Sequence, residues 1–194
     1  MTIDIAVLFS GGGRTVLNLL NHIEAGTLDA NISLSIASMD GLTGIDRLTE
    51  RGLDVAIART EDESLEIGDS RTIAWLEDTR PSLICLCGYL RLLKIETWMN
   101  GRVLNIHPAL LPKHGGKGMF GMHVHEAVIK NGDRKSGCTV HFVDEQYDHG
   151  ETIIQRTCQV EADDTPQSLA DKVFQLECDA YVDAIHKVAR QLKV

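Results

Sequence analysis

A run of five consecutive apolar residues, Leu83–Cys87, is the feature that most constrains what this chain can fold into. The run is short and has no polar face, which is typical of a strand covered on both sides of a parallel sheet. Ile3–Phe9 and Ile32–Met39 are also β-rich, and helical spacing of apolar residues follows both. This alternation predicts an α/β fold with a mainly parallel, twisted sheet flanked by helices.

The last third of the sequence has a different pattern. Gly137–Val143 and Thr152–Val160 alternate like antiparallel strands, and a polar loop of eight residues, Asp144–Glu151, joins them. A long helix is expected from Thr165 as N-cap and Pro166 at the first helical position. We expect one domain over residues 1–194, with an antiparallel edge near its C-terminal half. Other expected elements are strands at Val55–Ala58 and Val103–His107, and helices at Val16–Ile23, Ile45–Arg51, Ser70–Asp78 and His123–Lys130.

The charge balance limits the classes of partner. Lysine and arginine number 19 against 28 aspartates and glutamates, a net charge of -9. This argues against nucleic acid and against an anionic membrane surface as partners. A small anionic ligand remains compatible, because it responds to the local field. We therefore expect small-molecule substrates, and the oligomeric state stays open.

The cysteines and the N-terminus indicate a compartment. No stretch approaches the ~18 apolar residues of a membrane span, and the N-terminus lacks the basic segment of a secretory signal. The cysteine count is odd and contains no C-x-x-C pair, so we expect reduced, buried thiols in a cytoplasmic protein. The cysteines are Cys85, Cys87, Cys138, Cys158 and Cys178.

A glycine-rich turn follows the first strand. Ser10–Thr15 reads Ser-Gly-Gly-Gly-Arg-Thr and precedes a helix, whose free N–H groups and positive dipole end favour an anion. Arg14 could add a charge-assisted contact. Val16 stands where a dinucleotide fingerprint has its third glycine, and no Gly-Lys-Ser/Thr follows. Phosphate binding is the favoured interpretation, and a tight turn without a ligand is the alternative.

Two polar residues end the expected strand at Val103–His107. Asn105 and His107 are two apart, so they face the same side, at the sheet edge where open α/β folds bind ligands. An asparagine amide can donate to a developing oxyanion, and a histidine can move a proton. The alternative is a pair of core residues that hydrogen-bond nearby backbone.

The polar loop at Asp144–Glu151, which contains three acidic side chains before Gly150, is a third candidate for a functional site. An aspartate held against an imidazole fixes the tautomer of the ring. The alternative is a solvated hairpin loop. His123 and His125 have a metal-ligand spacing, but they fall on a predicted helix, where such residues do not share a face. No metal is therefore expected.

Several of these stretches together resemble a known family. Asn105–Lys113 (NIHPALLPK) is similar to the signature of the formyltetrahydrofolate-dependent formyltransferases. The resemblance continues in His141–Val143 (HFV), in the Asp148-x-Gly150-x-x-Ile153 pattern, in Gly88–Leu93 (GYLRLL) and in the opening turn. It covers nearly the whole chain in order.

The resemblance implies a Rossmann-like formyltransferase fold and a concrete reaction. The formyl group of 10-formyltetrahydrofolate, a co-substrate, would pass to the amine of glycinamide ribonucleotide in purine biosynthesis. Asn105 would stabilise the tetrahedral oxyanion, His107 would shuttle a proton, and Asp148 would orient His107 and help to take the amine proton.

The resemblance also assigns the two binding sites. The acceptor site comprises Gly12, Gly13, Arg14, Thr15 and Glu177. The folate site comprises Leu90, Arg91, Leu92, Leu93, Asp144, Glu145, Gln146 and Tyr147. Some positions depart from the family pattern: Arg14-Thr15 replaces Ser-Asn, His149 replaces glycine, Gly115–Gly121 is longer and could form a lid, and Arg71 is only a weak candidate for the folate-side arginine.

Other functions are compatible with parts of the pattern. A formyltetrahydrofolate hydrolase usually carries an extra N-terminal domain, which we do not expect because the first strand begins at Ile3. Transfer to methionyl-tRNA usually involves a C-terminal RNA-binding domain, and the acidic charge disfavours it. A different amine acceptor and a nonenzymatic binding module complete the alternatives. Retention of Asn105, His107 and Asp148 favours the enzyme.

Overall fold

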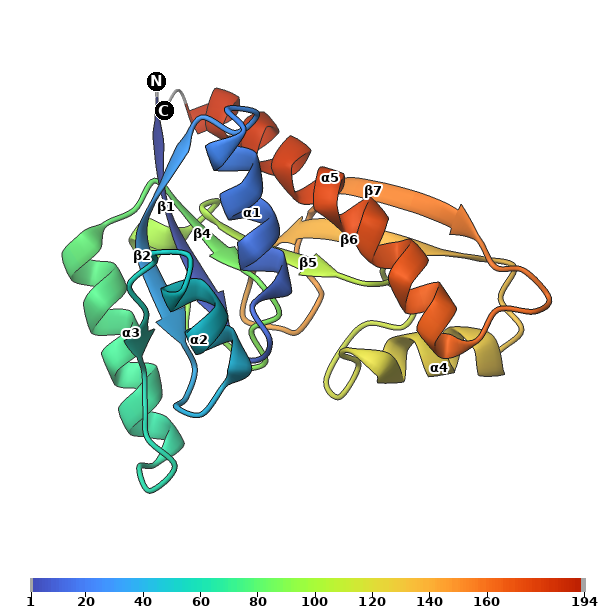
Figure 1. Cartoon of the computed structure of the whole chain (residues 1–194), viewed down its shortest axis with the longest axis horizontal. Coiled ribbons are helices and arrows are strands. Elements are labelled where there is room, and N and C mark those ends of the chain that lie inside the picture. The colour runs from blue at the N-terminus through green and yellow to red at the C-terminus, as the bar shows by residue number, and fades with distance from the viewer. Residues whose placement is uncertain (1, 193–194) are drawn as a thin grey trace.

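One seven-stranded sheet organises the chain, of which the computed structural model describes residues 2–192. The strand order is β3-β2-β1-β4-β5-β6-β7, and Figure 1 labels all of these strands except the two-residue β3. The strands are β1 (Ile3–Phe9), β2 (Ala30–Ala37), β3 (Ala56–Ile57), β4 (Leu83–Leu86), β5 (Val103–His107), β6 (Lys135–Phe142) and β7 (Thr152–Gln159). The helices are α1 (Arg14–Glu24), α2 (Thr43–Thr49), α3 (Leu65–Thr79), α4 (Met122–Lys130) and α5 (Pro166–Leu192), with a short 3₁₀ turn at Thr97–Met99.

The expected change of strand direction is confirmed. The pairs formed by β1 with β2, β1 with β4 and β4 with β5 are parallel, whereas β5–β6 and β6–β7 are antiparallel. The apolar run at Leu83–Leu86 is buried at every position, as its lack of a polar face predicts. The mainly parallel sheet with an antiparallel edge is therefore the observed fold class.

Helices cover both faces of the sheet, and β1 divides the core between them. Ile5, Val7 and Phe9 pack into the cluster that includes α1 and α5. Ala6 and Leu8 face the opposite cluster, which α3 covers. Successive residues on a strand point to opposite faces, so a strand apolar on both faces joins two core layers.

Element boundaries differ from expectation where the local signal is weak. α3 begins at Leu65, five residues before the predicted start. The sequence does not predict this first part of the helix, because its apolar residues show little helical periodicity. The third strand shrinks to Ala56–Ile57 at the sheet edge. α5 begins at Pro166 as predicted. Within residues 2–192, no helix is both long and apolar enough to cross a membrane.

One buried hydroxyl fixes α5 against the strands that carry the polar residues. The Tyr181 O–H lies 3.0 Å from both the Leu86 and the Leu104 carbonyl oxygens, and the Tyr181 side chain is fully buried. These carbonyls belong to β4 and β5. Glu177 lies four residues earlier on α5, so it shares the helix face that Tyr181 anchors.

We expect Tyr181→Phe to lower the free energy of unfolding by about 1–2 kcal/mol. The substitution keeps the ring but leaves two buried carbonyl groups without this donor. Urea denaturation of both proteins measures the difference. Equal unfolding free energies would show that the hydroxyl contributes nothing to the attachment of α5.

Candidate active site

The loops after β1, β4 and β5 meet where the sheet reverses its order. β1 lies between β2 and β4, so the connections leave β1 and β4 in opposite directions. Ligands of open α/β sheets bind at the carboxyl ends of strands at such a point. A cavity of about 620 Å³ opens there. Most of the predicted site residues line it: Gly12, Gly13, Arg14, Thr15, Leu90, Arg91, Leu92, Leu93, Asn105, His107, Gln146, Tyr147, Asp148 and Glu177.

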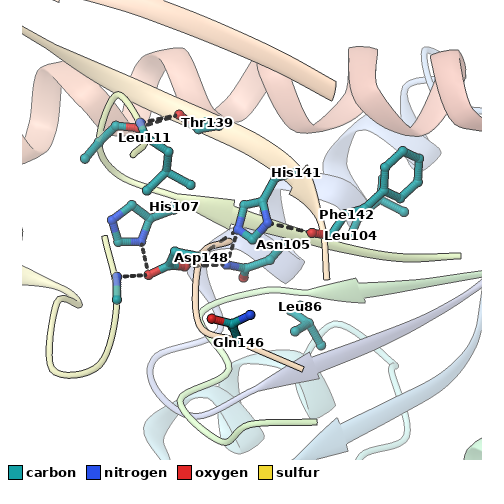
Figure 2. Close-up of polar contacts among 12 residues, drawn as sticks. Leu86, Leu104, Asn105, His107, Leu111, Thr139, His141, Phe142, Gln146 and Asp148 are labelled. Carbon is teal, nitrogen blue, oxygen red and sulfur yellow. Dashed lines mark hydrogen bonds and ion pairs between the residues drawn. The ribbon is translucent and has the colours of Figure 1, made fainter. Parts of the chain in front are cut away.

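The carboxylate of Asp148 lies at the centre of the polar groups in this cavity (Figure 2). Its Oδ2 accepts the Gly116 N–H at 2.9 Å and lies 3.4 Å from His107 Nδ1. Its Oδ1 lies 3.4 Å from Asn105 Nδ2 and 3.6 Å from His141 Nε2. Burial raises the pKa of Asp148, but a proton on the facing nitrogen of His141 or His107, together with the Gly116 N–H, holds it below its ordinary value. The site therefore holds a buried carboxylate that is charged at neutral pH.

Asn105 is oriented by a histidine with a fixed tautomer. His141 Nδ1 lies 2.7 Å from the Phe142 carbonyl oxygen, so Nδ1 carries the proton. The lone pair of His141 Nε2 then accepts from Asn105 Nδ2 at 3.2 Å. The second Nδ2 proton of Asn105 faces Asp148 at the longer distance of 3.4 Å, so it is the more easily redirected to a carbonyl oxygen.

His107 faces Asp148 with its unprotonated nitrogen. His107 Nε2 donates to the His114 carbonyl oxygen at 2.7 Å, which leaves the Nδ1 lone pair toward Asp148 Oδ2. Desolvation lowers the pKa of His107 in spite of the nearby carboxylate. His107 Nδ1 and Asp148 Oδ2 are thus two proton acceptors 3.4 Å apart, and a proton that arrives between them can be bound by both.

Two glycines allow Asp148 to enter the site. A Cβ at Gly150 would lie 1.9 Å from the Phe142 carbonyl oxygen, so no other residue fits there. A Cβ at Gly115 would lie 2.5 Å from a Leu111 methyl carbon and 3.2 Å from the Asp148 Cβ. These close approaches explain the glycine of the Asp-x-Gly pattern and the first glycine of the Gly115–Gly121 segment.

The turn predicted to bind an anion, Gly11–Thr15, packs closely against a glycine of α2. Gly13 has a left-handed φ of 69° and precedes the first turn of α1. Gly44, on α2, packs on this backbone: a Cβ there would lie 2.5 Å from the Gly11 carbonyl oxygen. The guanidinium of Arg14 lies 3.5 Å from the centre of the Phe174 ring. The turn thus presents backbone N–H groups and one cation to the cavity.

Glu177 and Arg14 reach the same cavity from α5 and α1. Desolvation raises the pKa of Glu177 to about 7, although the charge of Arg14 opposes this shift. Among residues 2–192, no group of three or more histidine, cysteine, aspartate or glutamate residues is arranged to hold a metal ion.

Only some of the residues predicted to bind the folate line the cavity. Leu90, Leu92 and Tyr147 are exposed apolar residues at the cavity. Arg91 also lines it and pairs with Asp69 at 2.5 Å.

Three residues that the sequence suggests for the folate site lie outside the cavity lining: Asp144, Glu145 and Arg71. Asp144 accepts from the Gln146 N–H at 2.8 Å and pairs with His149 at 2.7 Å, and its neighbour Glu145 also lies outside the lining. Arg71 is held by Glu63 through two contacts of 2.6 Å.

Sequence reasoning missed four parts of the site. The orienting role of His141 was not assigned, although the residue stands in the His-Phe-Val motif. Gly44 has no local signal, because its role depends on a contact between α2 and the glycine turn after β1. The backbone groups of His114 and Gly116 that bind His107 and Asp148 cannot be read from side-chain types. His125 lines the cavity from α4.

Comparison with known proteins defines the class. Residues 3–185 match the formyl transferase family, so the chain belongs to that family. It is 33% identical over 191 residues to the chloroplastic phosphoribosylglycinamide formyltransferase of Arabidopsis thaliana, across 96% of this chain and 65% of the relative. It is 35% identical over 187 residues to the trifunctional purine biosynthetic protein adenosine-3 of Drosophila melanogaster, across 93% of this chain and 13% of the relative. The chain thus spans just under two thirds of the plant protein and a small part of the insect protein.

Solved structures give the same result for the fold. The phosphoribosylglycinamide formyltransferase of Brucella melitensis is 31% identical with a TM-score of 0.85, and the alignment covers 97% of this chain and 96% of that one. The glycinamide ribonucleotide transformylase 1 of Symbiobacterium toebii is 29% identical with a TM-score of 0.83, across 95% and 86% of the two chains. The expected Rossmann-like formyltransferase fold is confirmed.

The partly buried carboxyl of Glu177 predicts a pH dependence of stability. Its pKa is raised from 4.5 to about 7 in the folded protein, so the folded state binds a proton that the unfolded state has released. The stability from this group is complete below pH about 4.5 and declines as the pH rises through 7. We expect wild type to lose up to about 3 kcal/mol more than Glu177→Gln over this range. Urea denaturation at several pH values measures both, and parallel curves would contradict the shift.

Proposed function

We propose that this protein transfers the formyl group of 10-formyltetrahydrofolate to the amine of glycinamide ribonucleotide, a step of purine biosynthesis. The observation that carries the proposal is the convergence of Asn105, His107 and Asp148 on one carboxylate-centred site in the cavity. The names of the relatives in Arabidopsis thaliana and Brucella melitensis support the same reaction.

The proposed reaction begins with attack of the amine lone pair on the formyl carbon. The carbonyl electrons move to the oxygen, where Asn105 Nδ2–H stabilises the developing negative charge. The amine proton passes to the acceptor atoms of the Asp148–His107 pair. Because Asp148 is ionised and His107 is neutral, this pair can accept the proton and share its charge.

Collapse of the tetrahedral intermediate completes the transfer. The electron pair returns from the oxygen, and the bond between the formyl carbon and the folate nitrogen breaks. The folate nitrogen takes up the proton that the Asp148–His107 pair holds. One proton leaves the amine and one reaches the folate, so the products are the formylated ribonucleotide and tetrahydrofolate, with no net release of protons.

Different parts of the cavity wall suit the two substrates. We assign the phosphate of the acceptor to the turn at Gly12–Thr15, where backbone N–H groups and Arg14 gather. We assign the folate to the side lined by Leu90, Leu92 and Tyr147, because the flat aromatic portions of a folate favour apolar contacts. The formyl carbon would then lie between them, beside Asn105.

The state of the cysteines supports a cellular compartment for the proposed reaction. All five cysteines are free, and Cys85, Cys87 and Cys138 are buried, which is compatible with a reducing compartment. We therefore place the reaction in the cytoplasm, with small-molecule partners.

Release of tetrahydrofolate should depend strictly on glycinamide ribonucleotide. A transferase gains by excluding water from the formyl carbon until the amine arrives, and an anion-binding turn serves a phosphorylated acceptor. We expect purified protein with 10-formyltetrahydrofolate to release tetrahydrofolate at a rate at least 100-fold higher with the acceptor than without it, an enhancement on the order of that from proximity and acid–base catalysis. Absorbance spectroscopy follows the folate, and product analysis follows formate.

Asp148→Asn is the matched control, because it keeps the side-chain shape and removes the charge. It should abolish the acceptor-dependent release and so assign that release to this cavity. Fast release of formate without any acceptor would overturn the transferase and favour a formyltetrahydrofolate hydrolase. Efficient use of another amine in place of the ribonucleotide would overturn the proposed acceptor.

A further inference from the structure

A second histidine lines the cavity without a part in the proposed chemistry. His125 lies on α4, is 4% exposed, and contributes to the cavity lining. Its Nδ1 is buried and has no hydrogen-bond partner. Within residues 2–192, the other side chains with such an atom are Ser35, Trp98 and Ser136, and none of these lines the cavity. A buried N–H without an acceptor costs more than a buried lone pair without a donor, so the unpartnered Nδ1 decides where the ring carries its proton.

The surroundings of the ring determine where its proton lies. Nδ1 has no acceptor, and a buried N–H without an acceptor is unfavourable, so the proton belongs on Nε2. Desolvation lowers the pKa of His125, and the charges of Arg14 and His107 lower it further, while Asp171 opposes them. The ring is therefore neutral at pH 7 and has one donor, Nε2–H, for a group inside the cavity.

The neighbours of His125 define the class of that group. Arg14, from α1, lies close enough to shift the pKa of both His125 and Glu177. Its guanidinium lies over the ring of Phe174 from α5, and residues of α1, α4 and α5 line the same cavity. A cation, the first turn of a helix and a neutral donor at one place form a set that suits a phosphate.

We propose that His125 Nε2–H donates to the phosphate of the acceptor, beside Arg14 and the turn at Gly12–Thr15. The proposal rests on the proposed function for the identity of the acceptor. His125 is thus a binding residue for the acceptor and takes no proton in the reaction. A neutral donor strengthens the phosphate site without placing a second cation beside Arg14.

Calorimetric titration of the whole protein tests this contact without any turnover. His125→Phe keeps a ring of similar shape and removes the donor, so we expect glycinamide ribonucleotide to bind about 10- to 100-fold more weakly, the usual effect of losing a hydrogen bond to a charged group. His125→Gln can place an amide N–H where Nε2 lies and should recover most of the affinity. His125→Asn is too short and should not.

The dephosphorylated acceptor separates a phosphate contact from general damage. Glycinamide ribonucleoside, which lacks the phosphate, should bind wild type and His125→Phe within about 2-fold of each other, because it never makes the contact. His123→Gln is the matched control, since His123 is on the same helix with a side chain 63% exposed. It should bind the ribonucleotide like wild type. Circular dichroism and thermal unfolding establish that each variant is folded.

The outcomes distinguish this proposal from the proposed function. Equal affinity of wild type and His125→Phe for the ribonucleotide would overturn the role of His125. An equal loss for the ribonucleotide and the ribonucleoside would place the contact away from the phosphate and would also overturn it. If wild type does not bind the ribonucleotide, the proposed acceptor is wrong. Inorganic phosphate then replaces it as the probe: weaker binding by His125→Phe supports the anion site, and unchanged or absent phosphate binding overturns it.

Discussion

The buried carboxylate of Asp148 can remain ionised only while groups from separate segments hold it. The Gly116 N–H of the glycine segment and the Asn105 amide N–H of β5 donate to it, and His107 of β5 and His141 of β6 enclose it. A buried charge left without its partners costs ~3–5 kcal/mol, so the loop, both strands and the glycine segment depend on one another. Asp148 also has a φ of 53°, a conformation that aspartate tolerates better than most residues.

The change from parallel to antiparallel pairing makes this arrangement possible. β4 and β5 run parallel, so the segments that follow them reach one edge, where β1 also delivers the glycine turn. β6 returns antiparallel to β5 and sets His141 opposite Asn105 in the register. The loop after β6 then brings Asp148 back over the end of β5. Tyr181 fixes α5 to β4 and β5, and so places Glu177 at the same cavity.

The sequence predicts those parts of the site that depend on local spacing. Asn105 and His107 face one side because they are two residues apart on a strand, and the glycine turn precedes a helix whose pattern is clear. The approach of Asp148 to His107 spans 41 residues and follows only from the resemblance to formyltransferases. Gly44, the His114 carbonyl acceptor and the Gly116 N–H donor depend on tertiary contacts that have no local pattern. The early start of α3 was missed for a related reason, because its first turns carry little apolar periodicity.

The central claim is that His107 and Asp148 act as one proton-accepting unit, and a double-mutant cycle on the formyl-transfer rate tests it most directly. His107→Ala, Asp148→Ala and the double variant are compared with wild type under saturating substrates. If the two groups form a unit, each single change should lower kcat nearly as much as both together, because loss of either partner removes the same function. Losses that multiply in the double variant would contradict the account and reduce Asp148 to an acidic loop residue that acts independently of His107.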